Sequence, residues 1–324
     1  MTPRVSVHIC AKETTPLGKL FFQCCLQALQ DSNWPDEIII VDDGCSKPVV
    51  ELYMWFAELF RNRGVPVTTA SAGGIKTYAG LRNKALELTD RFCTVMHWID
   101  TDEVYFPDQL NALKRDLEHV PDFRQAYTYF YHFINNPLQW QFKATKDNIF
   151  RFSPTLKWEK GVHEKMTGLV GTAAVQTNVQ YLHFGYIRPQ WQTCLKWLHY
   201  DMIEHGNVDR YKDERFEDAD KKVYTKPWFR EWRTPNTILD DRIPVCKEQG
   251  PWDVKNVPAA ARPIYEHANE WDQFLLRIED HSFWNHWEYL AKAPGLCNWR
   301  ETLDQVVKEM TECGWSYDGK KYQP

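Results

Sequence analysis

Two short apolar runs that each end in acidic residues constrain the fold more than any other feature of this sequence. Residues 37–41 read Glu-Ile-Ile-Ile-Val and stop at Asp42-Asp43-Gly44. Residues 94–99 read Thr-Val-Met-His-Trp-Ile and stop at Asp100-Thr101-Asp102. Apolar runs of this length are typical of fully buried strands in a parallel sheet. The abrupt change to aspartate indicates that both strands end at a polar edge.

Amphipathic segments alternate with the strand-like runs. We predict strands at Val5–Cys10, Glu37–Val41, Val65–Thr69 and Thr94–Ile99, and helices at Pro16–Gln30, Val50–Arg63, Gly80–Leu88 and Asp108–Glu118. This alternation builds parallel βαβ units, so we expect an α/β fold of Rossmann type, with a mostly parallel sheet flanked by helices. Ligands of such sheets bind outside the carboxyl ends of the strands. Both acidic clusters fall there.

Composition excludes several classes of protein. The 324 residues are 43% hydrophobic and 26% charged, which indicates a globular chain of one or two domains. The net charge of -5 does not point to a nucleic-acid partner. No run reaches the roughly 18 apolar residues that span a bilayer, and residues 1–13 leave no room for a signal peptide. The nine Cys contain no C-x-x-C pair and indicate reduced thiols, so we expect a soluble cytoplasmic protein.

The second acidic cluster predicts a metal site. Asp100 and Asp102 alternate, so on an extended segment both side chains face one side. Two carboxylates at a strand end repel each other unless a cation lies between them, and Mg²⁺ or Mn²⁺ takes such oxygen ligands while bridging to substrate phosphates. In the first cluster, Asp43 suits a hydrogen bond from a ribose hydroxyl or a base N–H. The alternative for Asp43 is a cap on the following helix.

A glycine-containing segment lies between the two clusters. Residues 72–86 read AGGIKTYAGLRNKAL, in which glycines allow close backbone approach and Lys76 and Arg82 suit a diphosphate. The segment contains neither the Walker pattern nor the dinucleotide pattern G-x-G-x-x-G. For Lys76, a surface loop is the equally weighted alternative.

Taken together, three segments resemble the family 2 glycosyltransferases of the GT-A fold. They are Val41-Asp42-Asp43-Gly44, Gly80-Leu81-Arg82-Asn83-Lys84-Ala85-Leu86 and Trp98-Ile99-Asp100-Thr101-Asp102-Glu103. The resemblance covers residues 4 to about 120 and implies a GT-A-like sheet. It implies that Asp42 and Asp43 hold the nucleoside, that Arg82 lies near the nucleotide, and that Asp102 binds the metal. For Asp100, contact with the ribose and metal binding through water both stay open.

Two later motifs are similar to those of a branch of the same family. Gly161-Val162-His163-Glu164 follows a tryptophan, and His183-Phe184-Gly185-Tyr186 comes about twenty residues on. The resemblance implies Glu164 as general base and His183 as a metal ligand beside Asp102. His163 and Tyr186 are secondary candidates from these motifs. Lys12 and Glu13, after the first strand, are candidates for the nucleotide pocket, although the family more often has Asn or a small residue there.

Chemistry supports these roles independently. Transfer of a sugar with inversion needs a carboxylate to take the proton of the acceptor hydroxyl, and a divalent cation offsets the charge of the leaving diphosphate. Neutral imidazole is a reasonable further ligand for Mn²⁺. For Glu164, the alternative is an ion pair with Lys160 or Lys165.

The chain changes character near residue 190. Ten of its 15 Trp follow that position, among frequent prolines. We therefore expect a transferase domain over residues 1–189 and a Trp-rich, mainly helical extension over residues 190–324. The tryptophans there either form an acceptor-binding platform or pack a small core.

The leading hypothesis is a metal-dependent, inverting hexosyl- or pentosyltransferase that uses a uridine or guanosine diphosphate sugar. A sugar nucleotidyltransferase and a non-catalytic carbohydrate- or protein-binding module are the alternatives. The acceptor, a carbohydrate or another hydroxyl-bearing molecule, stays open between polysaccharide precursors, lipid-linked sugars, proteins and hydroxylated bases of viral DNA.

Overall fold

The computed structural model describes residues 2–75, 77–134, 136–138, 140–160, 164–188, 257–271, 274–275, 316–317 and 322–323. The elements up to residue 188 are β1 (Val5–Ala11), α1 (Pro16–Gln30), β2 (Glu37–Asp42), α2 (Lys47–Asn62), β3 (Val67–Ser71), α3 (Tyr78–Leu88), β4 (Val95–Ile99), β5 (Glu103–Tyr105), α4 (Pro107–Leu117), β6 (Phe123–Ile134), β7 (Trp140–Arg151), β8 (Lys157–Glu159), β9 (Lys165–Thr167) and β10 (Ala173–Tyr186). After them come η3 (Ala259–Ala261), α7 (Arg262–Tyr265), η4 (Ala268–Glu270), β11 (Ser316–Tyr317) and β12 (Tyr322–Gln323).

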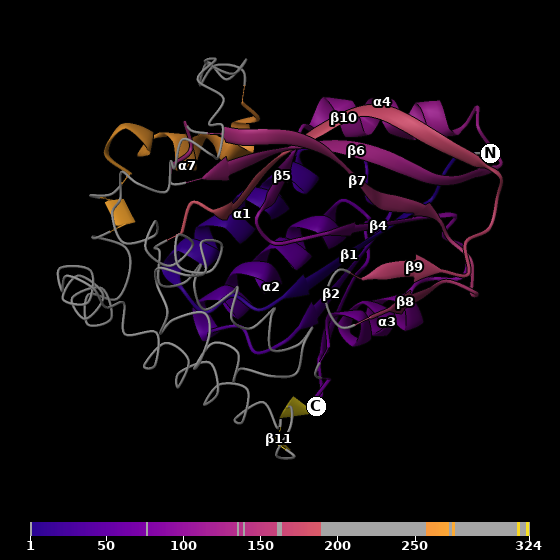
Figure 1. Cartoon of the computed structure of the whole chain (residues 1–324), viewed down its shortest axis with the longest axis horizontal. Coiled ribbons are helices and arrows are strands. Elements are labelled where there is room, and N and C mark those ends of the chain that lie inside the picture. The colour runs from indigo at the N-terminus through magenta and orange to yellow at the C-terminus, as the bar shows by residue number, and fades with distance from the viewer. Residues whose placement is uncertain are drawn as a thin grey trace, which may run out of the picture.

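One sheet of the order β3-β2-β1-β4-β7-β6-β10-β5 organises this part of the chain (Figure 1). Its first four strands are parallel, because β1 pairs with β2 and β4, and β2 pairs with β3. All four predicted strands and all four predicted helices are present, within three residues of the expected bounds. The predicted α/β class is confirmed: the parallel strands form a Rossmann-type sheet flanked by helices.

The largest shift in bounds is at α2, which begins at Lys47 instead of Val50. Ser46 has the extended backbone of an N-cap residue, and Pro48 occupies the first turn. Proline is favoured there because its fixed φ suits a helix and its missing N–H is not needed. The start of the helix therefore depends on local backbone chemistry that an apolar pattern does not contain.

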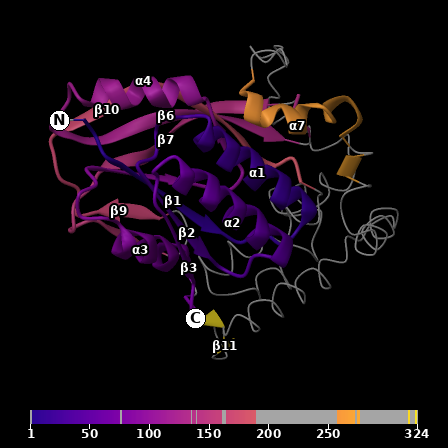
Figure 2. The same cartoon turned by 180° about the vertical axis from the view of Figure 1, so that it is seen from behind.

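Helices cover the two faces of the sheet with different parts of the core (Figure 2). Val5, Val7 and Ile9 of β1 share one cluster with the apolar sides of α1, α2 and α4. Ile39 and Val41 of β2 point to the other face, where they pack with residues of α3. The alternation along each strand buries both faces, as expected for parallel strands covered by helices.

The other half of the sheet is not a continuation of the βαβ pattern. Strand β7 is antiparallel to both β4 and β6, whereas β6 and β10 run parallel. The short strand β5 pairs with β10 in antiparallel register, which sets Glu103 opposite His183. The sequence pattern did not predict these strands. They matter because they place residues 132, 146 and 183 beside the end of β4.

Part of the predicted C-terminal extension shares a core with the sheet domain. Ile264 and Trp271 belong to the same buried cluster as Leu17 of α1 and Phe184 of β10. The indole N–H of Trp271 donates to the carbonyl of Ile187 at 3.0 Å. Of the two alternatives for these tryptophans, packing in a core is therefore the one observed for Trp271. Most of residues 190–324 lie outside the described residues, and the expected domain boundary stays a prediction. Among the described helices, none has the length and hydropathy to cross a bilayer.

Two glycines with left-handed backbones offer a matched test of packing at the β8–β9 hairpin. Gly168 has φ +69°, and a Cβ there would lie 1.8 Å from the Thr155 carbonyl oxygen. Gly74 has φ +85° with nothing within 4 Å of such a Cβ. We expect Gly74→Ala to lose about 1 kcal/mol of unfolding free energy from the backbone conformation alone, and Gly168→Ala more than about 3 kcal/mol. Urea denaturation measures both, and equal losses would contradict the clash.

Candidate functional site

The acidic loop after β4 is fixed by contacts with three other segments. The Thr101 hydroxyl donates to Glu13 at 2.5 Å, which ties the loop to the segment after β1. The Asp100 N–H donates to Glu103 of β5 at 3.3 Å, and the Phe184 N–H of β10 donates to the Asp102 carbonyl at 2.9 Å. The loop therefore has a defined conformation at the carboxyl edge of the parallel strands.

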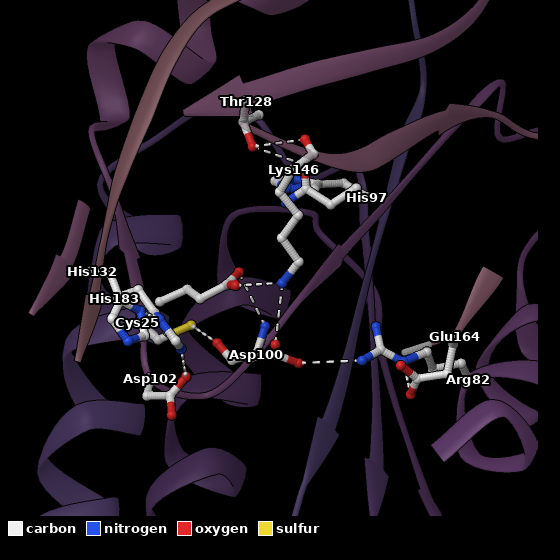
Figure 3. A network of polar contacts seen from close by, with 12 residues as sticks. Cys25, Arg82, His97, Asp100, Asp102, Thr128, His132, Lys146, Glu164 and His183 are labelled. Atoms are coloured by element: carbon white, nitrogen blue, oxygen red, sulfur yellow. Dashed lines mark hydrogen bonds and ion pairs between the residues drawn. The ribbon is translucent and has the colours of Figure 1, made fainter. Parts of the chain in front are cut away.

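Asp100 lies between two cationic side chains (Figure 3). Its Oδ2 is 3.2 Å from Lys146 Nζ, and its Oδ1 is 3.7 Å from the Arg82 guanidinium. Burial alone would raise the pKa of Asp100, but the charges of Lys146 and Arg82 bring the pKa below its ordinary value. The side chain is still 40% exposed. Asp100 is thus an ionised carboxylate that a ligand can reach.

Lys146 of β7 is a site residue that the sequence did not reveal. Its Nζ is 2.6 Å from Glu103 Oε1 and 3.5 Å from the centroid of the Trp98 ring. The guanidinium of Arg82 is also 3.5 Å from the centroid of that ring. A lysine in an unpredicted strand, within no recognisable motif, gives no signal; only the pairing of β7 with β4 brings it here.

Glu103 is the most deeply buried carboxylate of the group, with its side chain 1% exposed. Burial raises the pKa of Glu103 to about 7, although the nearby Lys146 opposes that rise. Its second oxygen accepts from the Tyr105 hydroxyl at 3.2 Å. Because it is enclosed, Glu103 orders Lys146 and the loop and does not face a ligand.

The structure brings the D-x-D residue Asp102 together with His183. Asp102 Oδ1 is 3.6 Å from His183 Nε2, and both side chains are largely buried. The other ring nitrogen of His183 is 2.8 Å from Nδ1 of His132 on β6. The Tyr186 ring packs on His132 with 4.5 Å between ring centroids. The pairing of β10 with β5 and β6 thus joins two motifs that are 81 residues apart in the sequence.

Glu13 and Arg188 form a second support for Asp102. Arg188 lies 3.1 Å from Glu13 Oε1 and 3.5 Å from Asp102 Oδ2. Glu13 is buried, and its carboxylate occupies the space in which a Cβ on Gly18 would lie. Glu13 was predicted to line a nucleotide pocket; here it links Thr101 to Arg188. Arg188 belongs to no predicted motif, because no pattern connects position 188 with the other half of the site.

Glu164 lies on the far side of Asp100 from Asp102 and His183 (Figure 3). Its Oε1 accepts from Arg82 Nε at 3.0 Å, so its ion pair is with Arg82 and not with Lys160 or Lys165. Burial would lower the pKa of Arg82, but Asp100 and Glu164 raise the pKa above its ordinary value. Arg82 thus stays charged and connects Glu164 with Asp100. A small pocket beside it is lined by His8, Cys10, Arg82, Trp98, Ile99, Asp100 and Trp158.

The first acidic pair divides into two different environments. Asp42 accepts from the N–H groups of Gly44 and Cys45 at 2.8 and 2.7 Å, and from the Tyr53 hydroxyl at 2.6 Å. These bonds outweigh burial and bring the pKa of Asp42 below its ordinary value. Asp43 Oδ2 is 3.7 Å from Lys12 Nζ, and burial raises the pKa of Asp43. Asp42 therefore shapes the turn, and Asp43 is the member that can turn to a ligand.

The remaining candidates Lys76 and His163 lie outside the described residues.

The described site contains more carboxylates than cationic side chains. Within the described residues, its ion pairs join the carboxylates Glu13, Asp43, Asp100, Asp102, Glu103 and Glu164 to the cations Lys12, Arg82, Lys146 and Arg188. Six carboxylates against four cations leave an excess of formal negative charge, which is smaller where Glu103, with its pKa of about 7, carries a proton. Over the same residues, no three His, Cys, Asp or Glu side chains converge as a metal centre. Asp102 and His183 offer one oxygen and one nitrogen donor, which suits a cation that takes its other ligands from phosphate and water.

Comparison with known proteins identifies no family. No family model matches the sequence, and no curated protein matches it. Among solved structures, the chain is similar to S. aureus TarS with 13% identity and a TM-score of 0.34, over 85% of this chain and 54% of that one. It thus spans about half the length of that TarS chain. A structure of TarS 1–349 matches with 11% identity and a TM-score of 0.34, over 98% of both chains.

A 4-diphosphocytidyl-2C-methyl-D-erythritol synthase from Anaerococcus prevotii matches with 11% identity and a TM-score of 0.32, over 46% of this chain and 70% of that one. Scores this low identify neither a family nor an activity. The fold is described by the order and direction of the chain's own strands.

The buried Glu103 gives the site a measurable pH dependence of stability. Because its folded-state pKa of about 7 lies above the ordinary 4.5, the folded chain binds this proton more tightly than the unfolded chain. Its contribution to stability is complete below about pH 4.5 and is lost as the pH rises through 7. We expect the unfolding free energy of the wild type, relative to Glu103→Gln, to fall by about 3 kcal/mol from pH 4.5 to pH 8. A difference that stays constant with pH would contradict this.

Proposed function

We propose that this chain is a glycosyltransferase that moves a sugar from a uridine or guanosine diphosphate sugar to an acceptor hydroxyl, with inversion and with a divalent cation, Mn²⁺ or Mg²⁺. The observation that supports this most is the meeting of Asp102 with His183, beside Asp100 and Arg82, at the carboxyl edge of parallel strands. Nucleotides bind at that edge of open α/β sheets. The resemblance to family 2 glycosyltransferases agrees with this assignment.

The donor's nucleoside is assigned to the side of the site near Asp43 and Asp100. Both carboxylates are partly exposed and are ion-paired to a cation, so they remain acceptors for ribose hydroxyls or a base N–H. Arg82 is assigned to the diphosphate together with Lys76. Asp42 and Glu13 act through the loops that they hold, and Lys12 acts through Asp43.

Asp102 and His183 are assigned to the cation. Their facing atoms are 3.6 Å apart, which is too long for a hydrogen bond but within reach of a common ion with coordination distances of about 2 Å. When bound, the cation would offset the charge on the departing diphosphate. Arg188 already contacts the other oxygen of Asp102 and holds that carboxylate in place.

Glu164 is assigned the proton of the acceptor hydroxyl. Inversion requires a base on the face of the sugar opposite the leaving group, and a carboxylate can fill that role. Among the described residues, Arg82 joins Glu164 to Asp100 on the donor side, and Glu164 makes no ion pair with Asp102 or His183. We assign the transferred sugar to the side of Asp100 between base and cation.

The metal assignment is tested with Asp102→Asn, which keeps the shape of the side chain and removes its charge. The wild type should bind uridine or guanosine diphosphate more tightly with Mn²⁺ than without it. In Asp102→Asn, we expect that Mn²⁺ enhancement to fall at least tenfold, because a charged ligand of the cation is lost. Isothermal titration calorimetry measures both, and an unchanged enhancement would exclude Asp102 as a ligand.

The base assignment is tested with Glu164→Gln, after a panel of nucleotide sugars has been screened for Mn²⁺-dependent hydrolysis. We expect donor affinity to stay within about threefold of wild type, while turnover falls about a hundredfold or more, the usual scale of a positioned base. Lys165→Gln, a neighbouring change of charge outside the site, is the control. Turnover that survives in Glu164→Gln would place the base elsewhere.

A further inference from the structure

His132 of β6 is directly beside His183 of β10, although neither the motifs nor the family resemblance includes it. The two residues are register partners in the parallel pair β6–β10. Their Nδ1 atoms are 2.8 Å apart, and the His132 side chain is buried, with the residue 7% exposed. This contact joins an unassigned residue to an assigned one.

A contact of 2.8 Å between two imidazole nitrogens holds one proton. Two lone pairs or two N–H groups facing each other at this distance would repel, so one ring donates and the other accepts. The question is which ring carries the proton. The contact alone does not decide which ring carries it. Under the proposed function, the role of the other nitrogen of His183, Nε2, decides it.

The Nε2 atom of His183 faces Asp102 at 3.6 Å, beyond the range of a hydrogen bond. If Nε2 presents a lone pair to a cation shared with Asp102, the ring proton of neutral His183 must be on Nδ1. His183 then donates from Nδ1, and His132 accepts with its own Nδ1. Ligating histidines commonly have their second nitrogen fixed by such a hydrogen bond.

Neighbouring aromatic rings hold the two imidazoles in this arrangement. Tyr186 packs on His132 with ring centroids 4.5 Å apart. Phe130 stands edge-on to both imidazoles, 6.2 Å from His132 and 6.0 Å from His183. Rotation of either ring away from the shared hydrogen bond would meet these side chains.

We propose that His132 is a positioning residue, which accepts a hydrogen bond from His183 Nδ1 and so keeps the Nε2 lone pair of His183 directed at the cation position beside Asp102. This rests on the proposed function, because it takes Asp102 and His183 as the cation ligands. It adds a residue that acts through His183 and does not touch the cation itself.

A matched pair of substitutions separates the hydrogen bond from packing. His132→Asn keeps an acceptor oxygen close to the position of the imidazole Nδ1, whereas His132→Leu has nearly the same shape and no polar atom. We expect His132→Leu to weaken Mn²⁺ binding by 10- to 100-fold, the usual effect of removing such a partner, and His132→Asn to stay within about threefold of wild type. Mn²⁺ alone is the probe, and the electron paramagnetic resonance signal of free Mn²⁺ measures affinity.

A second measurement needs no metal. Long-range ¹H–¹⁵N spectra of metal-free protein at pH 8, above the ordinary imidazole pKa of about 6.5, report which nitrogen of His183 carries the proton. We expect the proton on Nδ1 in the wild type and in His132→Asn, and a mixture of tautomers in His132→Leu. Circular dichroism melting shows whether each variant folds.

The outcomes separate this inference from the proposed function. If wild type binds Mn²⁺ and His132→Leu binds it equally well, or if His183 carries its proton on Nε2, the role of His132 is wrong while the proposed function stands. If the wild type binds no Mn²⁺ while His183 carries its proton on Nδ1, the cation assignment fails, and this inference fails with it.

Discussion

The compensation of clustered carboxylates at one edge of the sheet is the constraint on which the rest of the site depends. Asp100, Asp102 and Glu103 are almost consecutive, and burying such carboxylates without partners costs free energy. Three cationic side chains, Arg82 of α3, Lys146 of β7 and Arg188 after β10, offset these charges; the pKa of Asp100 is lowered, while the pKa of Glu103 stays raised, at about 7. The loop after β4 is therefore stable only when α3, β7 and the end of β10 are all in place.

This dependence gives the mixed half of the sheet, β7, β6, β10 and β5, its part in the site. The parallel strands alone deliver the carboxylates and Arg82, as βαβ units do. Strand β7 adds Lys146, and strand β10 adds His183 and leads into Arg188. The antiparallel strand β7 and the strand β10, which is parallel to β6, thus complete a site that the Rossmann-type half only begins.

The sequence could predict those features that depend on short, local residue patterns. The strands at residues 37–41 and 94–99, the helix at 16–30 and the carboxylates at the strand ends all follow from short apolar patterns, and the structure has them in the expected places. His183 came from a family motif. His132, Lys146 and Arg188 could not be predicted, because their contacts depend on pairing and register between strands distant in sequence. Asp42 shows the reverse: its motif was clear, but only the structure shows that the turn and Tyr53 use its oxygens.

The charge left over in the described site also bears on how a donor would enter it. The excess of carboxylates over cations repels a bare nucleoside diphosphate, which is itself an anion, at the distances of direct contact. Under the proposed function, a cation at Asp102 and His183 would offset this excess of negative charge, and Arg82 and Lys76 would then meet the phosphates. Cation and nucleotide should accordingly bind with positive coupling, each raising the affinity for the other by the same factor. A site that binds the diphosphate without a cation would instead carry an excess of positive charge.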